Sequence, residues 1–178
     1  MRAGPAPGRD ELRGLLVRLG PEPREPLRIV AYLLDTNVLV RLANLDDASH
    51  AVAARAIIGL HRRGEALCIA PQNLIEFRGV ATRPAAANGL GLGVAEAESQ
   101  ATSFESAFLL LPETPDLFPA WKALVGSRAV TGKQVHDARL VAARNVHGVS
   151  HLLTFDGSHF GRLSSYGPGV VIVDPASV

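Results

Sequence analysis

The sequence has little cysteine, little net charge and no long apolar run. Cys68 is the only cysteine in 178 residues, which excludes an internal disulfide and fits a reducing compartment. A formal net charge of +1 means that any contact with nucleic acid would have to use a local basic patch. No apolar run is long enough to span a bilayer, and the N-terminus lacks the pattern of a secretory signal. We therefore expect a soluble, cytoplasmic protein.

The composition divides the chain into an arm and one domain. Residues 1–28 form an N-terminal arm in which five prolines lie among Gly and Arg, with one possible short amphipathic helix. Its role stays open between a flexible arm, a partner-binding helix and an artefact of an upstream start codon. Residues 29–178 are the domain, and a hydrophobic content of 47% is enough for a sizeable core.

Short apolar segments alternate with helical patterns along this domain. The segments predict strands that begin near Ile29 and at 67–70, 109–111, 152–155 and 170–173. Helices are predicted after Asp35 and over 48–63, 71–83, 96–107, 115–125 and 133–145. This alternation is typical of an α/β fold with a mostly parallel, short-stranded sheet and helices on both faces.

Two acids follow predicted strands directly. Asp35 comes after the run ending in Leu33-Leu34, and Asp156 comes after the strand that ends with Phe155. In a parallel sheet both emerge at the edge where ligands bind. Thr36 and Asn37 follow Asp35 and have side-chain oxygens suited to capping the next helix.

Two further acids lie on predicted helices. Glu76 shares a helix face with Gln72 and Asn73, and Asp137 lies in the first turns of the helix after Gly132-Lys133. Acids gathered at one sheet edge repel each other, and a hard divalent cation such as Mg²⁺ or Mn²⁺ removes that repulsion. Zinc is less expected because the chain lacks a Cys/His ligand spacing. Taken singly, each acid also fits a structural role as a turn residue, a solvated face or a helix-dipole partner.

Four segments around these acids resemble the ordered acidic motifs of PIN-domain proteins, most closely the VapC-type toxins of toxin–antitoxin systems. The segments are Leu33-Leu34-Asp35-Thr36-Asn37, Asn73-Leu74-Ile75-Glu76-Phe77, Gln134-Val135-His136-Asp137-Ala138 and Leu153-Thr154-Phe155-Asp156. The resemblance covers the chain from about residue 30 to its C-terminus and leaves out the arm.

The resemblance implies a compact three-layer fold and a metal-dependent ribonuclease, which is usually a homodimer inhibited by a small antitoxin. Asp35 and Asp137 would be the principal ligands of Mg²⁺ or Mn²⁺, and Glu76 and Asp156 would complete the catalytic pocket. Asn37 and Thr154 resemble the polar residues that orient those acids. The family often has another acid where this chain has His159, so one metal ion or two stays open.

Other roles and other functions stay open from the sequence. Four cations flank the acids and are candidates for holding phosphate, although solvated surface positions explain them as well: Arg41, Arg78, Lys133 and Arg139. We expect His136 to lie on another face of its helix than Asp137. The alternatives to a nuclease are a PIN-like module that only binds RNA or protein, and an aspartyl-phosphate phosphotransferase. The phosphotransferase would need a second Asp at the position of Asn37.

Overall fold

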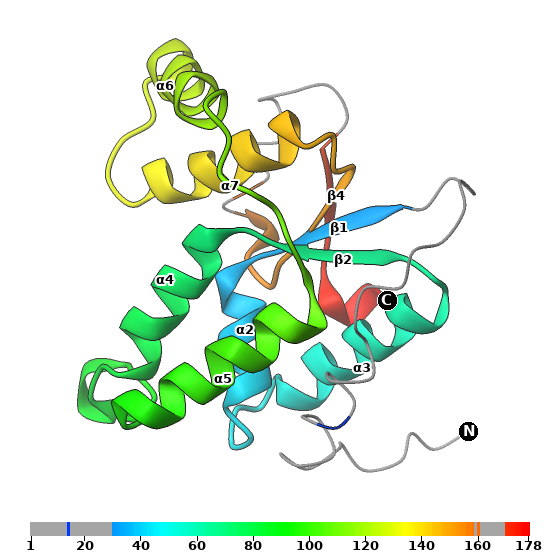
Figure 1. Ribbon diagram of the computed structural model, residues 1–178, viewed down its shortest axis with the longest axis vertical. Helices are drawn as coiled ribbons and strands as arrows, with labels where there is room; N and C mark the ends of the chain where they lie inside the picture. The colour runs from blue at the N-terminus through cyan, green and yellow to red at the C-terminus, as the bar shows by residue number, and fades with distance from the viewer. Residues whose placement is uncertain (1–13, 15–29, 159, 161–169) are drawn as a thin grey trace.

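The computed structural model describes residues 14, 30–158, 160 and 170–178 (Figure 1). Apart from Gly14, the predicted arm over residues 1–28 lies outside the described residues, and so does His159. In the part of the chain that is described, no helix has the length and apolar character needed to cross a membrane.

The centre of the fold is a five-stranded sheet in which every neighbouring pair is parallel. Its strands are β1 (Ala31–Leu34), β2 (Ala66–Ile69), β3 (Leu109–Leu110), β4 (His151–Leu153) and β5 (Val171–Val173), in the order β3-β2-β1-β4-β5. Because β1 lies in the middle, the chain leaves it at the centre of one sheet edge. Parallel strands need crossover connections, and helices provide the connections from β1 to β2, from β2 to β3 and from β3 to β4.

The sheet separates two hydrophobic cores. Successive side chains of a strand point to opposite faces, and accordingly Tyr32 and Leu34 enter one core while Leu33 enters the other. The first core packs under α2 (Thr36–Ala43), α3 (His50–Arg62), α4 (Pro71–Ala81) and α5 (Val94–Ala107). The second packs under α7 (Gln134–Val146), against which α6 (Leu117–Arg128) lies. Figure 1 shows these helix layers on opposite sides of the strands, so the predicted three-layer α/β fold is confirmed.

Most predicted element boundaries agree with the structure to within three residues. The largest difference at a strand is at β4, where residues 152–155 were predicted and the strand covers His151–Leu153. Thr154 and Phe155 therefore lie beyond the strand, in the turn that leads to Asp156. The helix predicted over 71–83 ends at Ala81, before Arg83-Pro84.

The start of α2 corrects the prediction that Thr36 and Asn37 cap this helix. Asp35 occupies the N-cap position in an extended conformation (φ −77°, ψ 152°), and Thr36 and Asn37 are the first two helical residues. The Asp35 carboxylate makes no hydrogen bond to the helix backbone. All three side chains point instead into the network described next, which accounts for the absence of a side-chain cap.

Candidate active site

The carboxyl ends of β1 and β4 hold Asp35 in a hydrogen-bonded corner. The Thr154 hydroxyl donates to Asp35 Oδ2 at 2.7 Å, and Asn37 Nδ2 donates to the same oxygen at 2.6 Å. The backbone N–H of Asp35 donates to the Leu153 carbonyl at 2.9 Å, which fixes the two strand ends in register. One carboxylate oxygen is therefore held by two donors from neighbouring segments.

Asn37 and Thr154 also position the turn that leads to Asp156. The Phe155 backbone N–H donates to Asn37 Oδ1 at 3.2 Å, and the Asp156 backbone N–H donates to the Thr154 hydroxyl at 3.0 Å. Asp156 therefore lies next to the hydrogen-bonded corner that holds Asp35, as expected for acids that follow neighbouring parallel strands. The structure places Asn37 and Thr154 where they contact Asp35, and the orienting role proposed for them remains a prediction.

Asp35 is only 8% exposed, and its environment disfavours its charge. Burial raises the pKa of the Asp35 carboxyl from 3.8 to about 6, and the negative charges of Asp137 and Glu76 contribute to the same rise. The hydrogen bond from the Thr154 hydroxyl acts in the opposite direction and lowers this pKa. Since like charges act on Asp35 from two helices, the acids of α4 and α7 converge on the end of β1.

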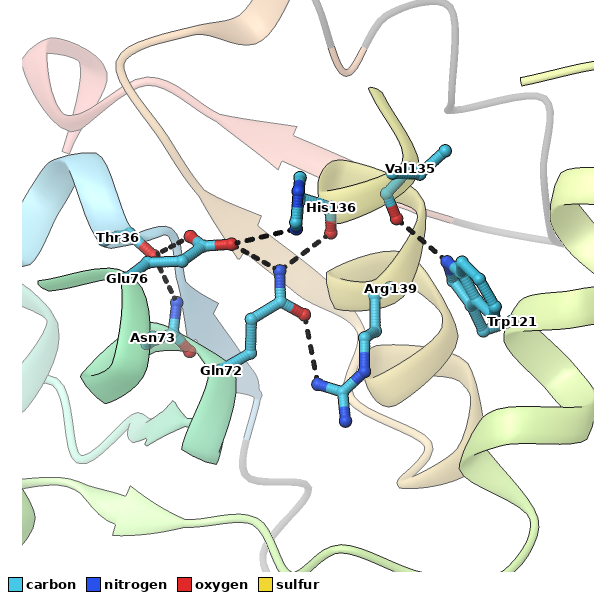
Figure 2. Close-up of polar contacts among 8 residues, drawn as sticks. All are labelled: Thr36, Gln72, Asn73, Glu76, Trp121, Val135, His136 and Arg139. Carbon is cyan, nitrogen blue, oxygen red and sulfur yellow. Dashed lines mark hydrogen bonds and ion pairs between the residues drawn. The ribbon is translucent and has the colours of Figure 1, made fainter. Parts of the chain in front are cut away.

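Glu76 comes from α4 and is held by two donors (Figure 2). Thr36 Oγ1 donates to Glu76 Oε2 at 2.6 Å, and Gln72 Nε2 donates to Glu76 Oε1 at 2.7 Å. Asn73 Nδ2 donates to Thr36 Oγ1 at 3.2 Å and to the Leu34 carbonyl at 3.0 Å, so the start of α4 is joined to the end of β1. Pro71 occupies the first turn of α4 as predicted, and Asn73 Oδ1 accepts from the Ala70 backbone N–H at 2.8 Å.

His136 is solvated, which is one of its predicted environments, but it also lies beside an acid of the cavity. Its Nδ1 lies 3.8 Å from Glu76 Oε1, although the side chain is 67% exposed. Asp137 follows His136 in the first turn of α7, where the helix dipole favours a negative charge. The first turn of α7 therefore presents both residues to the acidic centre.

The four predicted acids line one cavity of about 720 Å³. Arg41, Arg83 and Lys133 also line it, and they bring positive charge close to the acids. Arg78 and Arg139 are not among the described lining residues. Arg78 pairs with Glu98 at 2.6 Å and Arg139 pairs with Glu113 at 2.7 Å. Two of the four candidate cations therefore lie outside this cavity, in ion pairs at partly solvated positions.

The donor set suits a hard divalent cation. Four acids supply carboxylate oxygens to the cavity that contains the buried Asp35, and a cation would relieve the repulsion that contributes to the raised Asp35 pKa. Among the described residues, no three Asp, Glu, His or Cys side chains are close enough to enclose a metal ion by themselves. Mg²⁺ commonly uses one or two carboxylates and keeps several waters, so a ligand pair such as Asp35 and Asp137 fits this geometry.

The sequence did not assign a role in the site to Gln72, Thr36 or Arg83. Gln72 had a usable signal, because it lies four residues before Glu76 and such residues are neighbours on a helix. Thr36 and Arg83 had none, since their roles depend on the approach of α2 to α4 and on the path of the chain after α4.

Comparisons with known proteins agree with this fold. Solved structures of similar fold include VapBC2 from Rickettsia felis bound to a DNA fragment from its promoter (TM-score 0.59, 16% identity, 82% of this chain and 98% of that chain). They also include the sarcin–ricin loop cleaving toxin VapC20 from Mycobacterium tuberculosis (TM-score 0.56, 21% identity, 73% and 93%). VapBC-1 from nontypeable Haemophilus influenzae is a third (TM-score 0.60, 12% identity, 82% and 98%).

Curated proteins give no match to this chain. The family model of the PIN domain matches residues 32–164, a range that includes all four acids and extends from β1 past β4. The chain belongs to the PIN-domain family.

Proposed function

We propose that this protein is a metal-dependent endoribonuclease and the toxin of a toxin–antitoxin pair. The observation that carries the proposal is the buried Asp35 carboxyl, whose pKa is raised to about 6 by burial and by the charges of Asp137 and Glu76. An acid with a purely structural role is expected where its surroundings stabilise the charged carboxylate. Acids that are held together against their own repulsion are typical of a site that binds a cation.

The acids divide between two roles in the proposed reaction. Asp35 and Asp137 would hold the cation, which when bound would neutralise charge at the scissile phosphate and lower the pKa of a water. Glu76 or Asp156 accepts a proton from the attacking water as general base. Thr154 and Asn37 hold one oxygen of Asp35 in place, which would orient this carboxylate for binding a cation.

The cations of the cavity provide a place for the substrate backbone. Arg41 is oriented by a hydrogen bond of 3.0 Å to the Asn37 carbonyl and by the Phe155 ring, whose centroid lies 4.5 Å from the guanidinium carbon. Lys133 lies just before α7, next to the acids. We propose that both bind phosphates of the RNA on either side of the cleaved bond.

The toxin assignment and the partners rest on the structural neighbours. Several of these are toxin–antitoxin complexes, including VapBC proteins and FitAB bound to a DNA fragment (TM-score 0.55, 18% identity). VapC20 is described as a toxin that cleaves the sarcin–ricin loop. By analogy we propose a small antitoxin partner, a homodimer, RNA as the substrate and the cytoplasm as the site of action.

Cleavage of a structured RNA by the purified protein tests the proposal. We expect cleavage with Mg²⁺ or Mn²⁺ and none with EDTA, and we expect Asp137→Asn to remove it. A folded wild-type protein that binds the RNA without cutting it in either metal would favour the alternative of a binding module. Equal cleavage by the wild type and Asp137→Asn would point to a contaminating nuclease and overturn the assignment.

A further inference from the structure

The acids of the cavity are carried by helices from different layers of the fold. Glu76 lies on α4, which packs on the first core and contacts α2 and α5. Asp137 lies on α7, which packs on the second core and contacts α6. The distance between these acids therefore depends on how α4 is fixed relative to α7, across the edge of the sheet.

Gln72 connects the two helices at this point. Its Nε2 donates to Glu76 Oε1 at 2.7 Å and to the backbone carbonyl of His136, the residue before Asp137, at 2.9 Å. Its Oε1 accepts from Arg139 of α7 at 3.2 Å. Figure 2 shows the amide between the Glu76 carboxylate on one side and the first turns of α7 on the other.

Only one orientation of the Gln72 amide satisfies all three contacts. The carboxylate and the carbonyl are acceptors and need the NH₂ group, whereas the guanidinium is a donor and needs the oxygen. A rotated amide would face its oxygen to two acceptors and its NH₂ group to a cation. Arg139 is itself fixed by Glu113 at 2.7 Å, so the orientation of the amide is set from outside the cavity.

Gln72 is 5% exposed, and its side chain contacts Glu76 of its own helix and two groups of α7. The i, i+4 pair with Glu76 would hold the carboxylate on any isolated helix. The bond to the His136 carbonyl adds nothing to α4 itself and serves only to set its position against α7. The same amide thus fixes the Glu76 rotamer and the register of the two helices.

We infer that Gln72 is a positioning residue, which sets the separation of Glu76 and Asp137 and thereby the affinity of the site for its cation. This inference rests on the proposed function, because it assumes that Asp137 is a ligand of the cation and that Glu76 acts beside it at the same site. Gln72 itself contacts neither the cation nor the substrate in this scheme. It acts through Glu76 and through the backbone of α7.

Gln72→Met tests the inference, since methionine has a similar volume and offers no amide. Outer contacts of metal ligands are worth about 10- to 100-fold in affinity or activity, so we expect a loss of this size in Mn²⁺ affinity and in kcat. Free Mn²⁺ measured by electron paramagnetic resonance gives the affinity without reference to cleavage. KM for RNA at saturating Mn²⁺ should not change, because the phosphate-binding cations are untouched.

Two other variants distinguish a positioning role of Gln72 from a general weakening of the contacts of α4. Arg78→Met removes the Arg78–Glu98 ion pair, an exposed link of α4 to α5 outside the cavity, and should leave Mn²⁺ affinity and kcat unchanged. Arg139→Met leaves Gln72 in place but frees its amide, and should give a smaller loss in the same direction. Thermal unfolding of each metal-free variant shows whether a loss comes from unfolding.

The outcomes distinguish the positioning role of Gln72 from the nuclease assignment. A Gln72→Met protein with wild-type Mn²⁺ affinity and kcat, beside an active wild type, overturns the positioning role and leaves the nuclease assignment intact. An equal loss in Arg78→Met also overturns it, because any weakening of α4 would then suffice. A wild type that neither binds Mn²⁺ nor cleaves RNA overturns both.

Discussion

The cavity has a strand side and a helix side, and the two hold their acids in different ways. On the strand side, Asp35 is 8% exposed and is fixed by donors from residues adjacent to β1 and β4. On the helix side, the Glu76 side chain is 30% exposed and is fixed by contacts between α2, α4 and α7. On the strand side, the surroundings disfavour the charged form of Asp35 and restrict the movement of its side chain. On the helix side, Glu76 is less buried, and its position depends on the packing of three helices.

This difference indicates which side of the cavity determines the affinity for a cation and which side can change the position of its acid. A charge that is buried among other charges gains most from a cation, so the strand side should dominate metal affinity. A half-exposed acid gains less, but its position can be changed by small movements of a helix. We therefore expect substitutions on the strand side to have larger effects than equivalent ones on the helix side.

The largest expected effect is the loss of cleavage in Asp35→Asn. The neutral amide keeps the shape of the carboxylate and removes the charge that attracts the cation, so cleavage should fall to background and Mn²⁺ binding should be lost. The assay of RNA cleavage with Mn²⁺ measures this directly. Glu76→Gln should retain measurable Mn²⁺ binding, and equal loss of binding in both variants would contradict the difference between the two sides.

Asp35→Asn should also stabilise the metal-free protein against unfolding. The Asp35 pKa rises from 3.8 to about 6 on folding, so the folded state binds this proton more tightly than the unfolded state. The contribution of this bound proton to the free energy of unfolding is complete below pH 3.8. It is lost as the pH rises through about 6. At pH 7 the charged Asp35 lowers the free energy of unfolding by on the order of 3 kcal/mol, as an upper bound for the metal-free state.

Urea unfolding of wild type and Asp35→Asn at several pH values measures this contribution. We expect Asp35→Asn to be the more stable protein at pH 7 without metal and the difference to vanish near pH 4. Mn²⁺ should reverse the order at pH 7, because it stabilises only the protein that binds it. A difference that does not depend on pH would mean that Asp35 is not the titrating group.

The strand side could largely be predicted from the sequence. An apolar run that ends on an acid predicts both the strand and the place of that acid, and two such runs in a parallel sheet predict that Asp35 and Asp156 share an edge. The family resemblance added Asn37 and Thr154, and the structure shows both in contact with Asp35. Local sequence is informative here because neighbouring strands fix their ends in register.

The helix side could be predicted only in part. The helical period gave the shared face of Gln72 and Glu76, but not the donation from Thr36 or the approach of His136. Those contacts depend on how α2, α4 and α7 pack around the edge of the sheet. For the same reason the sequence offered Arg78 and Arg139 as substrate-binding cations, whereas each pairs with an acid outside the cavity.

A smaller effect is expected when one threonine hydroxyl is removed from each side. Thr154→Val removes the donor to Asp35, and Thr36→Val removes the donor to Glu76, with little change in shape in either case. We expect Thr154→Val to weaken Mn²⁺ binding by about tenfold or more, the range for outer contacts of metal ligands. Each acid keeps one other donor, and Thr36→Val should weaken binding less because Glu76 is more exposed than Asp35 and is not a principal ligand in the proposed scheme. Titration with Mn²⁺ compares the two, and a larger loss in Thr36→Val would reverse the proposed order.

The smallest expected effect concerns the substrate and not the metal. Arg41 lies on the strand side of the cavity, held by the Asn37 carbonyl and the Phe155 ring, and its guanidinium is free to meet a phosphate at one face. Arg41→Gln should raise KM for RNA about 3- to 10-fold without changing Mn²⁺ affinity, since a partly exposed charge contact is worth about 1 kcal/mol. Arg78→Gln is the matched control, because Arg78 already pairs with Glu98 outside the cavity.

The salt dependence sharpens this last comparison. If Arg41 binds phosphate, the wild type should lose RNA affinity with rising salt more steeply than Arg41→Gln, because one fewer counterion is released by the variant. Arg78→Gln should follow the wild-type slope. Parallel slopes for all three proteins would place the RNA backbone away from Arg41. They would leave Lys133 and Arg83 as the cations of the cavity that hold the substrate.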